Sequence, residues 1–244
     1  MEITPFEIIE NKRVATDTYC LTLRGDCTSI TVPGQFVNIE LPGFFLRRPL
    51  SVARVAEDVL TLAYKIVGSG TLELSEMQSG SLELLTGLGN GFNPGEAGDA
   101  PLLIGGGAGA APLLWLAEFL VSREITPWVA LGFNSADEVF FASEFMELGA
   151  KLLVATLDGS SGAKGFVTDA VTAAGIKFDY VYSCGPEPML KAVYDMSDTD
   201  GEFSFEERMA CGFGACMGCS CETKYGSKRI CRDGPVLKRN EIVW

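Results

Sequence analysis

Four cysteines in the last quarter of the chain have the spacing of metal-ligating thiolates. Cys211, Cys216, Cys219 and Cys231 follow the pattern C-x4-C-x2-C-x11-C, with two glycines inside the first gap. The first three spacings match the plant-type pattern for a [2Fe–2S] cluster, in which one glycine-rich loop and one distant cysteine hold the irons. A loop that wraps a small inorganic core and turns its N–H groups toward sulfur needs open backbone geometry. The spacing therefore predicts a one-electron carrier.

Structural zinc and disulfides are the alternative uses of these cysteines. Zinc ribbons usually pair two C-x2-C knuckles, whereas this chain has one. Residues 1–7 carry acids and no long apolar core, so we expect no signal peptide and a cytoplasmic location. Because that compartment is reducing, it favours thiols or metal ligands over disulfide bridges. Cys221 is predicted to be a spectator rather than a ligand. Cys20 and Cys27 are expected to be small apolar residues in strands or turns.

Composition limits the chemistry. The 244 residues are enough for two domains and a small module, and a hydrophobic fraction of 47% fits a well-packed globular protein. The net charge of −13 disfavours nucleic acid and anionic membranes as partners. The chain has no histidine, which excludes Ser–His–Asp hydrolysis, His-ligated zinc catalysis and His-ligated haem. Hydride and electron transfer by bound cofactors fits this inventory.

Residues 1–97 are predicted to form an antiparallel β-barrel. Six stretches rich in β-branched, aromatic or leucine residues are separated by Pro-Gly pairs and single glycines. One short helix is expected over residues 71–77, and this combination is typical of a closed barrel. The expected strands are 7–14, 19–23, 36–41, 50–55, 60–67 and 81–85.

The pattern changes at Pro94–Gly98, and residues 98–200 are predicted to form a parallel, doubly wound α/β sheet because strands then alternate with helices. The apolar run 100–117 is interrupted by glycines and prolines, which favours a strand, a glycine loop and a helix over a membrane span. An acidic linker over 195–202 and a cysteine module over 201–244 are expected to follow. The expected strands are 102–104, 128–131, 152–155 and 180–183, and the expected helices are 110–122, 141–148, 167–174 and 187–194.

Two stretches of the barrel could bind phosphate. Residues 47–51 read Arg-Arg-Pro-Leu-Ser, and guanidinium groups bind phosphate in a bidentate manner. Residues 67–71 read Val-Gly-Ser-Gly-Thr, where Thr71 is predicted to be the N-cap of a helix whose start can accept an anion. Each stretch alone is also compatible with a solvated turn. Together they suit a dinucleotide such as FAD.

Two loops of the α/β region could bind a second nucleotide. Residues 105–109 read Gly-Gly-Gly-Ala-Gly and join a strand to a helix, where backbone N–H groups can meet a pyrophosphate. The spacing differs from G-x-G-x-x-G, so a plain tight turn is the alternative. Cys184-Gly185-Pro186 follows the last strand of this region, at the carboxyl end of the sheet where ligands bind. The alternative is a buried cysteine before a turn.

These motifs, in this order, resemble the ferredoxin–NADP reductase superfamily, and in particular the electron-transfer subunits of dihydroorotate dehydrogenase B. Four further strings carry the resemblance, which covers essentially the whole chain: residues 89–92, 158–169, 206–211 and 231–236. The resemblance implies a multidomain protein with FAD in the barrel, NAD at the α/β domain and [2Fe–2S] in the C-terminal module.

The resemblance also assigns residues. It implies that Cys184 lies near the reacting nicotinamide and flavin rings. Position 50 departs from the wider superfamily, which often has an aromatic residue where this chain has Leu50. The implied FAD contacts are Arg48, Pro49, Leu50, Ser51, Lys65, Ile66, Val67, Gly70 and Thr71. The implied nucleotide contacts are Gly105, Gly106, Gly107, Gly109, Gly185 and Pro186, and the cluster ligands are Cys211, Cys216, Cys219 and Cys231.

The resemblance further implies a partner and a pathway. An FMN-containing catalytic subunit would oxidise dihydroorotate in pyrimidine biosynthesis, within a heterotetramer. NAD is favoured over NADP because the loops 132–138 and 157–160 are acidic, although Lys164 is close in sequence. One alternative is the small subunit of an NADH-dependent ferredoxin:NADP⁺ oxidoreductase or a sulfide dehydrogenase. A non-enzymatic alternative is a binding module stapled by zinc.

Overall fold

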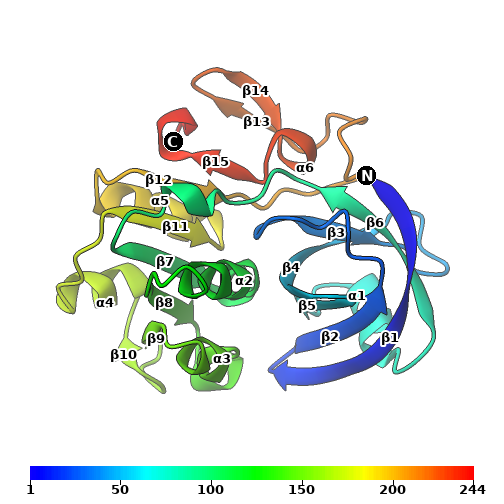
Figure 1. The fold of residues 1–244 in the computed structure, drawn as a ribbon, viewed down its shortest axis with the longest axis horizontal. Helices are drawn as coiled ribbons and strands as arrows, with labels where there is room; N and C mark the ends of the chain where they lie inside the picture. Colours follow the sequence, from blue (N-terminus) through cyan, green and yellow to red (C-terminus); the bar gives the residue numbers. More distant parts are fainter.

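Antiparallel strands close the first part of the chain into a barrel, as the sequence predicted (Figure 1). The computed structural model describes all of residues 1–244. The strands follow the order β1-β2-β5-β4-β3-β6, and β6 pairs with β1 to close the barrel. Their bounds are β1 (Glu2–Ala15), β2 (Thr18–Gly25), β3 (Phe36–Ile39), β4 (Arg48–Ala56), β5 (Val59–Lys65) and β6 (Ser81–Leu88), with α1 (Ser69–Glu76) before β6 and the short helix η1 (Pro94–Glu96) after it.

A chain of hydrogen bonds in the barrel core holds α1 in place. Tyr64 is buried inside the barrel, and its hydroxyl donates a hydrogen bond to Oδ1 of Asn11 at 3.1 Å. Nδ2 of Asn11 in turn donates to the carbonyl oxygen of Leu74 in α1 at 2.7 Å. Buried polar groups need such partners, so this chain of bonds joins two strands to the helix.

Helix α1 begins earlier than predicted. Its N-cap is Gly68, so the prediction that Thr71 is the N-cap is wrong. The hydroxyl of Thr71 nevertheless accepts the N–H groups of Val67 and Gly68, at 2.9 and 3.3 Å. The Thr71 side chain, at the third position of the helix, thus reaches back and satisfies the N–H of the N-cap residue and that of the residue before it.

The second part of the chain is a mainly parallel sheet with helices on both faces, as predicted (Figure 1). The strand order is β10-β9-β8-β7-β11-β12-β15. Helices α2 and α3 pack on the face toward the barrel, and α4 and α5 pack on the other face. The bounds are β7 (Pro101–Gly106), η2 (Gly107–Gly109), α2 (Ala110–Val121), β8 (Trp128–Phe133), η3 (Ala136–Glu138), α3 (Ala142–Glu147), β9 (Lys151–Thr156), β10 (Ala163–Lys164), α4 (Val167–Ala173), β11 (Tyr180–Cys184) and α5 (Glu187–Met196).

Helix α2 is apolar on nearly all sides because it lies between the sheet and the barrel. Leu113 and Leu116 are fully buried, in one apolar cluster with Ala53 and Ala63 of the barrel. The apolar run 100–117 therefore forms β7, η2 and the start of α2, as expected from its glycines and prolines. No helix of the structure is long and apolar enough to cross a membrane.

The C-terminal segment returns to the sheet. Strand β12 pairs in parallel with β11, and β15 pairs with β12 in the antiparallel sense. The predicted linker over 195–202 is therefore wrong at both ends, because Asp195 and Met196 belong to α5 and Gly201 and Glu202 belong to β12. The division at residue 200 stays a prediction, since the sheet continues across it. The remaining bounds are β12 (Gly201–Ser204), β13 (Ser220–Thr223), β14 (Gly226–Arg229), α6 (Ile230–Asp233), β15 (Val236–Lys238) and η4 (Arg239–Glu241).

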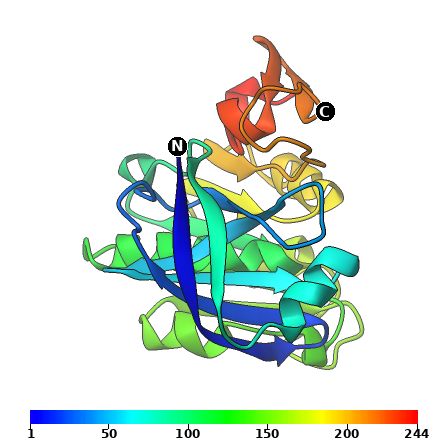
Figure 2. The same cartoon turned by 90° about the vertical axis from the view of Figure 1, so that its right-hand side faces the viewer.

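The segment between β12 and β15 projects as a small module above the other two parts (Figure 2). Asn90, in the loop that leaves the barrel, holds its base. Nδ2 of Asn90 donates to the carbonyl oxygen of Val236 at 2.7 Å, and its Oδ1 accepts the N–H of Val236 at 3.0 Å. The Asn90 side chain thus makes the two hydrogen bonds with Val236 that the backbone of a neighbouring strand would otherwise make.

A buried carboxyl group lies where the three parts of the chain meet. Glu202 is 3% exposed, and its Oε2 accepts the N–H of Asn93 at 2.7 Å. The hydroxyl of Tyr182 donates to the carbonyl oxygen of the same Asn93 at 2.8 Å. Burial raises the pKa of Glu202 to about 7, although the Asn93 N–H and Lys238 oppose the rise.

This pKa gives a stability prediction for Glu202→Gln. The folded-state pKa lies above the ordinary value, so the stability that protonation contributes is fully present below about pH 4.5 and is lost as the pH rises through about 7. Glutamine keeps the acceptor for Asn93 without the charge. We expect its free energy of unfolding at pH 8 to exceed that of the parent by about 1–3 kcal/mol, with a smaller difference at pH 5. Urea unfolding at both pH values measures this, and equal stability at pH 8 contradicts it. The exposed Glu147→Gln is the control.

Candidate functional site

A cavity of about 330 Å³ lies where the barrel faces the parallel sheet. Its volume is in the range of cofactor pockets. Barrel residues form one wall, and the loop after β7, the end of β11 and the segment after β12 form the other. The structure does not bring Ile66 or Gly70 into the lining. The other predicted FAD contacts do line it: Arg48, Pro49, Leu50, Ser51, Lys65, Val67 and Thr71.

Only one arginine of the predicted pair faces this cavity. Arg47 forms an ion pair with Glu40. The Arg48 guanidinium lies over the ring of Phe44, 4.7 Å from its centroid, and lines the cavity. A Cβ at Gly70 would overlap that guanidinium, so the glycine lets Arg48 lie against the first turn of α1. A guanidinium beside a helix N-terminus suits a phosphate.

Lys65 connects the barrel to the α/β domain. Its Nζ lies 3.1 Å from Oε1 of Glu138 in η3. Burial tends to raise the pKa of Glu138, but its bonds with Lys65 and Asn134 outweigh burial and lower it. Next to this pair, the N–H of Thr16 donates to the carbonyl oxygen of Asp137 at 2.8 Å. Part of the acidic loop predicted to select NAD thus also holds the two domains together.

Cys184 lies at the end of β11, in the wall of the cavity that the α/β domain contributes. Its side chain is 2% exposed. Burial raises the pKa of its thiol far above the ordinary value; Glu206 adds to the rise, and contact with the Ser204 hydroxyl opposes it. A thiol in this setting stays neutral. Cys184 is therefore suited to shaping the cavity rather than to acting as a thiolate nucleophile.

The two loops predicted to bind the nucleotide form one surface. Cys184 is the strand partner of Gly105, so both loops leave the sheet at the carboxyl ends of neighbouring parallel strands. A Cβ at Gly109 would overlap the carbonyl group of Cys184, and one at Gly106 would lie 3.1 Å from Pro186. Close packing of the loops therefore requires these small residues. Open α/β sheets bind ligands at this edge.

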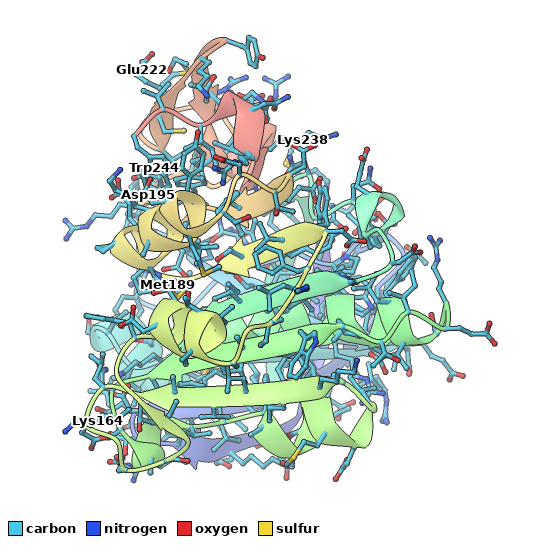
Figure 3. All side chains as sticks on the ribbon, turned by 90° about the vertical axis from the view of Figure 1, so that its left-hand side faces the viewer. Lys164, Met189, Asp195, Glu222, Lys238 and Trp244 are labelled. Atoms are coloured by element: carbon cyan, nitrogen blue, oxygen red, sulfur yellow. The ribbon has the colours of Figure 1, made fainter.

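The end of β9 presents a carboxylate to the same edge of the sheet. Oδ1 of Asp158 accepts the N–H and the hydroxyl of Ser160, at 2.9 and 2.6 Å, and the hydroxyl bond is the main cause of its lowered pKa. Lys164 packs its aliphatic stem against Gly159, and Figure 3 shows it at the periphery of the molecule. The end of β9 is thus flanked by the ionised carboxylate of Asp158 and by Lys164 of the neighbouring strand β10, whose strand partner is Thr156.

The four predicted cluster ligands lie in two pairs. The N–H of Cys216 donates to Sγ of Cys211 at 3.5 Å, and the two thiols are in hydrogen-bond contact. The N–H of Cys231 donates to Sγ of Cys219 at 3.4 Å, again with contact between the thiols. Two pairs of thiolates fit the two irons of a [2Fe–2S] cluster.

The loop around the first pair favours thiolate. Burial raises the pKa of Cys211, but hydrogen bonds from the backbone of Cys216, Phe213 and Ala215 outweigh it and lower the pKa to about 6. The thiolate is the form that binds metal. Cys221 differs: it lies on β13 outside both pairs, and burial raises its pKa, with Glu207 adding to the rise.

Sequence reasoning missed over half of the cavity lining. Most of these residues are ordinary side chains on strands or loops, with no motif that marks them. A signal existed for Ala108 in the glycine loop 105–109, for residues 206–209 in the string that leads into Cys211, and for Pro235 in the string 231–236. The missed lining residues are Phe36, Ala63, Tyr64, Ala108, Ser204, Phe205, Glu206, Glu207, Met209 and Pro235.

Comparison with known proteins agrees with this geometry. Residues 206–243 match the family described as the iron–sulfur cluster binding domain of dihydroorotate dehydrogenase B. Two similar relatives are each named dihydroorotate dehydrogenase B (NAD(+)), electron transfer subunit. The one from Geobacillus sp. is 42% identical, over 97% of this chain and 96% of its own length. The one from Fusobacterium nucleatum is 40% identical, over 99% of both chains.

Solved structures share the fold. A chain from the structure of an NADH-dependent reduced ferredoxin-NADP oxidoreductase superposes with a TM-score of 0.88 at 31% identity, covering 98% of this chain and 90% of its own. A ferredoxin NADP⁺ reductase from Neisseria gonorrhoeae, solved with bound FAD and NADP, superposes with a TM-score of 0.69 at 20% identity, covering 80% of this chain and 90% of its own. The latter similarity concerns the fold alone.

The paired thiols predict different results for two neighbouring cysteines. Cys216→Ala removes one thiolate of the first pair, so we expect loss of iron, acid-labile sulfide and visible absorbance. Cys221→Ala, outside both pairs, is the matched control and is expected to keep all three. Iron and sulfide per chain, measured after anaerobic purification, test this. A Cys216→Ala protein with a complete cluster contradicts the ligand assignment.

Proposed function

The chain belongs to the family of dihydroorotate dehydrogenase B electron transfer subunits, and on that premise we propose that it carries electrons between a separate catalytic subunit and NAD. One observation supports this most strongly. The cavity that holds the predicted FAD contacts is bordered by the nucleotide loops at Cys184 and by both ends of the cluster module. Met209 lies two residues before Cys211, and Pro235 lies four residues after Cys231. The three proposed cofactor sites therefore border one cavity.

The residues around the cavity fit FAD. Arg48 and the start of α1 offer an anion site for its pyrophosphate. Phe36, Leu50 and Tyr64 offer apolar surface for its ring system. Bound FAD would supply the conversion between two-electron hydride chemistry and the one-electron chemistry of an iron–sulfur cluster. The protein's own task is to hold the rings and to keep water away from the contact with the nicotinamide.

The proposed partner is a catalytic subunit that contains FMN and oxidises dihydroorotate to orotate in pyrimidine biosynthesis. The names of the relatives describe an electron transfer subunit, which implies a second subunit. We propose a cytoplasmic heterotetramer with two copies of each chain. The cavity of this chain then has no need to bind dihydroorotate.

NAD is the proposed nucleotide. Asp158 lies at the end of β9, where a carboxylate can accept hydrogen bonds from a ribose hydroxyl and would repel a 2′-phosphate. Glu138 lies on the neighbouring loop, although Lys65 neutralises it. Lys164 is the nearby cation, and its stem follows the backbone at Gly159.

A second candidate is the small subunit of an NADH-dependent ferredoxin:NADP⁺ oxidoreductase. The similarity to such a structure, with a TM-score of 0.88, favours it. Sequence identity is lower there, 31% against 42%, so the dihydroorotate dehydrogenase assignment is preferred. The two differ in the partner: co-purification of an FMN protein supports the first, and a larger flavoprotein with iron–sulfur clusters supports the second.

The experiment that tests the proposed function is an anaerobic visible spectrum of the purified chain before and after NADH is added. We expect flavin and cluster absorbance in the starting spectrum, and bleaching of both by NADH, because all three sites border one cavity. NADPH is expected to act at least about tenfold more slowly, a difference of about 1.4 kcal/mol in transition-state binding. A colourless protein with zinc and no iron contradicts the proposal, and equal rates with NADPH contradict the nucleotide assignment.

Cys184 has a separate test. Alanine removes only a sulfur atom from the cavity wall, so Cys184→Ala is expected to bind FAD and NADH normally but to slow flavin reduction by about tenfold to a hundredfold, since small errors in reacting geometry cost this much. Stopped-flow reduction of FAD by NADH measures the rate. An unchanged rate shows that Cys184 is only a packing residue.

A further inference from the structure

Asn38 is a buried polar residue that the packing of the barrel does not explain. It lies on β3 and is 1% exposed. Its neighbours Val37 and Ile39 belong to the core of the barrel. Side chains alternate along a strand, so Asn38 shares the opposite face with Phe36, which lines the cavity. Its strand partner Pro49 also lines the cavity.

The Asn38 amide holds the cluster loop. Nδ2 donates a hydrogen bond to the carbonyl oxygen of Cys211 at 3.2 Å, although the two residues are 173 positions apart in the chain. The next residue, Gly212, has a φ of +75°, and a Cβ there would overlap the same Nδ2. The backbone of Cys211, the first predicted cluster ligand, thus packs directly against β3, which forms part of the wall of the flavin cavity.

The carbonyl oxygen of the Asn38 amide destabilises the folded protein. Oδ1 of Asn38 is buried and has no hydrogen-bond partner in the protein. A buried polar atom without a partner destabilises the folded state, and β-branched or aromatic residues suit a strand better than asparagine. Stability of the barrel therefore gives no reason for an amide here. The contact with Cys211 does give one.

We propose that Asn38 is a positioning residue that sets the separation between the flavin cavity and the first cysteine pair. This inference rests on the proposed function, because it concerns transfer of single electrons between those two sites. The hydrogen bond fixes the carbonyl of Cys211, and Cys211 with Cys216 would hold one iron of the proposed cluster. Electron transfer falls steeply with distance, so a loop free to move away from β3 transfers electrons more slowly.

The test compares Asn38→Leu and Asn38→Asp in the full chain. Leucine has a similar volume and removes the donor. Aspartate keeps the shape and turns an acceptor toward the Cys211 carbonyl. Thr86→Val is the matched control, because Thr86 is also fully buried in the barrel but bonds to Ser29 and Glu2 rather than to the cluster loop. FAD and iron content, thermal stability and the electron paramagnetic resonance spectrum of the reduced cluster are measured for each.

Stopped-flow mixing with NADH then separates two rates. In both Asn38 variants we expect reduction of FAD to stay within about twofold of the parent, and reduction of the cluster to slow by about tenfold or more, as expected for misplaced reacting groups. An altered resonance spectrum, or loss of iron with FAD retained, in these variants and not in Thr86→Val also supports the inference. Cluster reduction at the parent rate with an unchanged spectrum overturns it. A parent protein that lacks flavin or cluster overturns the proposed function itself.

Discussion

The rest of the structure depends on the apolar contact between α2 and the barrel. The helix buries leucines against the sheet on one side and against Ala53 and Ala63 on the other, and small residues on the barrel allow close approach. The same helix is preceded by the glycine loop that forms part of the nucleotide surface. Packing of this density resists deformation. The distance from the nucleotide loops to the barrel wall is thus set by a core rather than by a hinge.

The cluster module is held to this unit by backbone pairing at both ends. Strands β12 and β15 extend the parallel sheet, and Asn90 completes the base of the module from the barrel side. A carboxyl group at this junction is bonded to Asn93 between the same three parts. The module therefore needs little apolar core of its own. Sheet hydrogen bonds fix both ends of the module, and Cys219, Ile230 and Cys231 share an apolar cluster with the sheet.

The sequence predicted much of the architecture because its strongest signals are local. Pro-Gly pairs indicated the ends of the barrel strands, the alternation of strands and helices indicated the sheet, and the cysteine spacing indicated the four proposed cluster ligands. The errors fall where tertiary contacts decide. Gly201 and Glu202 looked like an acidic linker, but pairing with β11 makes them a strand. Arg47 looked like an anion ligand beside Arg48 but pairs with Glu40. No local pattern could show that Asn38 contacts a loop 173 residues away.

The pairing of β12 with β15 also has a consequence for how the protein is made. All four paired cysteines lie in the segment between these strands, and β15 follows the last of them in the chain. The edge of the sheet is therefore completed only after every ligand has been synthesised. Once β12 and β15 have paired, both ends of the segment between them are fixed to the sheet. Loss of the metal can therefore increase the mobility of this segment without separating it from the sheet. Assembly of the inorganic centre and its later repair are thus local events on an already folded body.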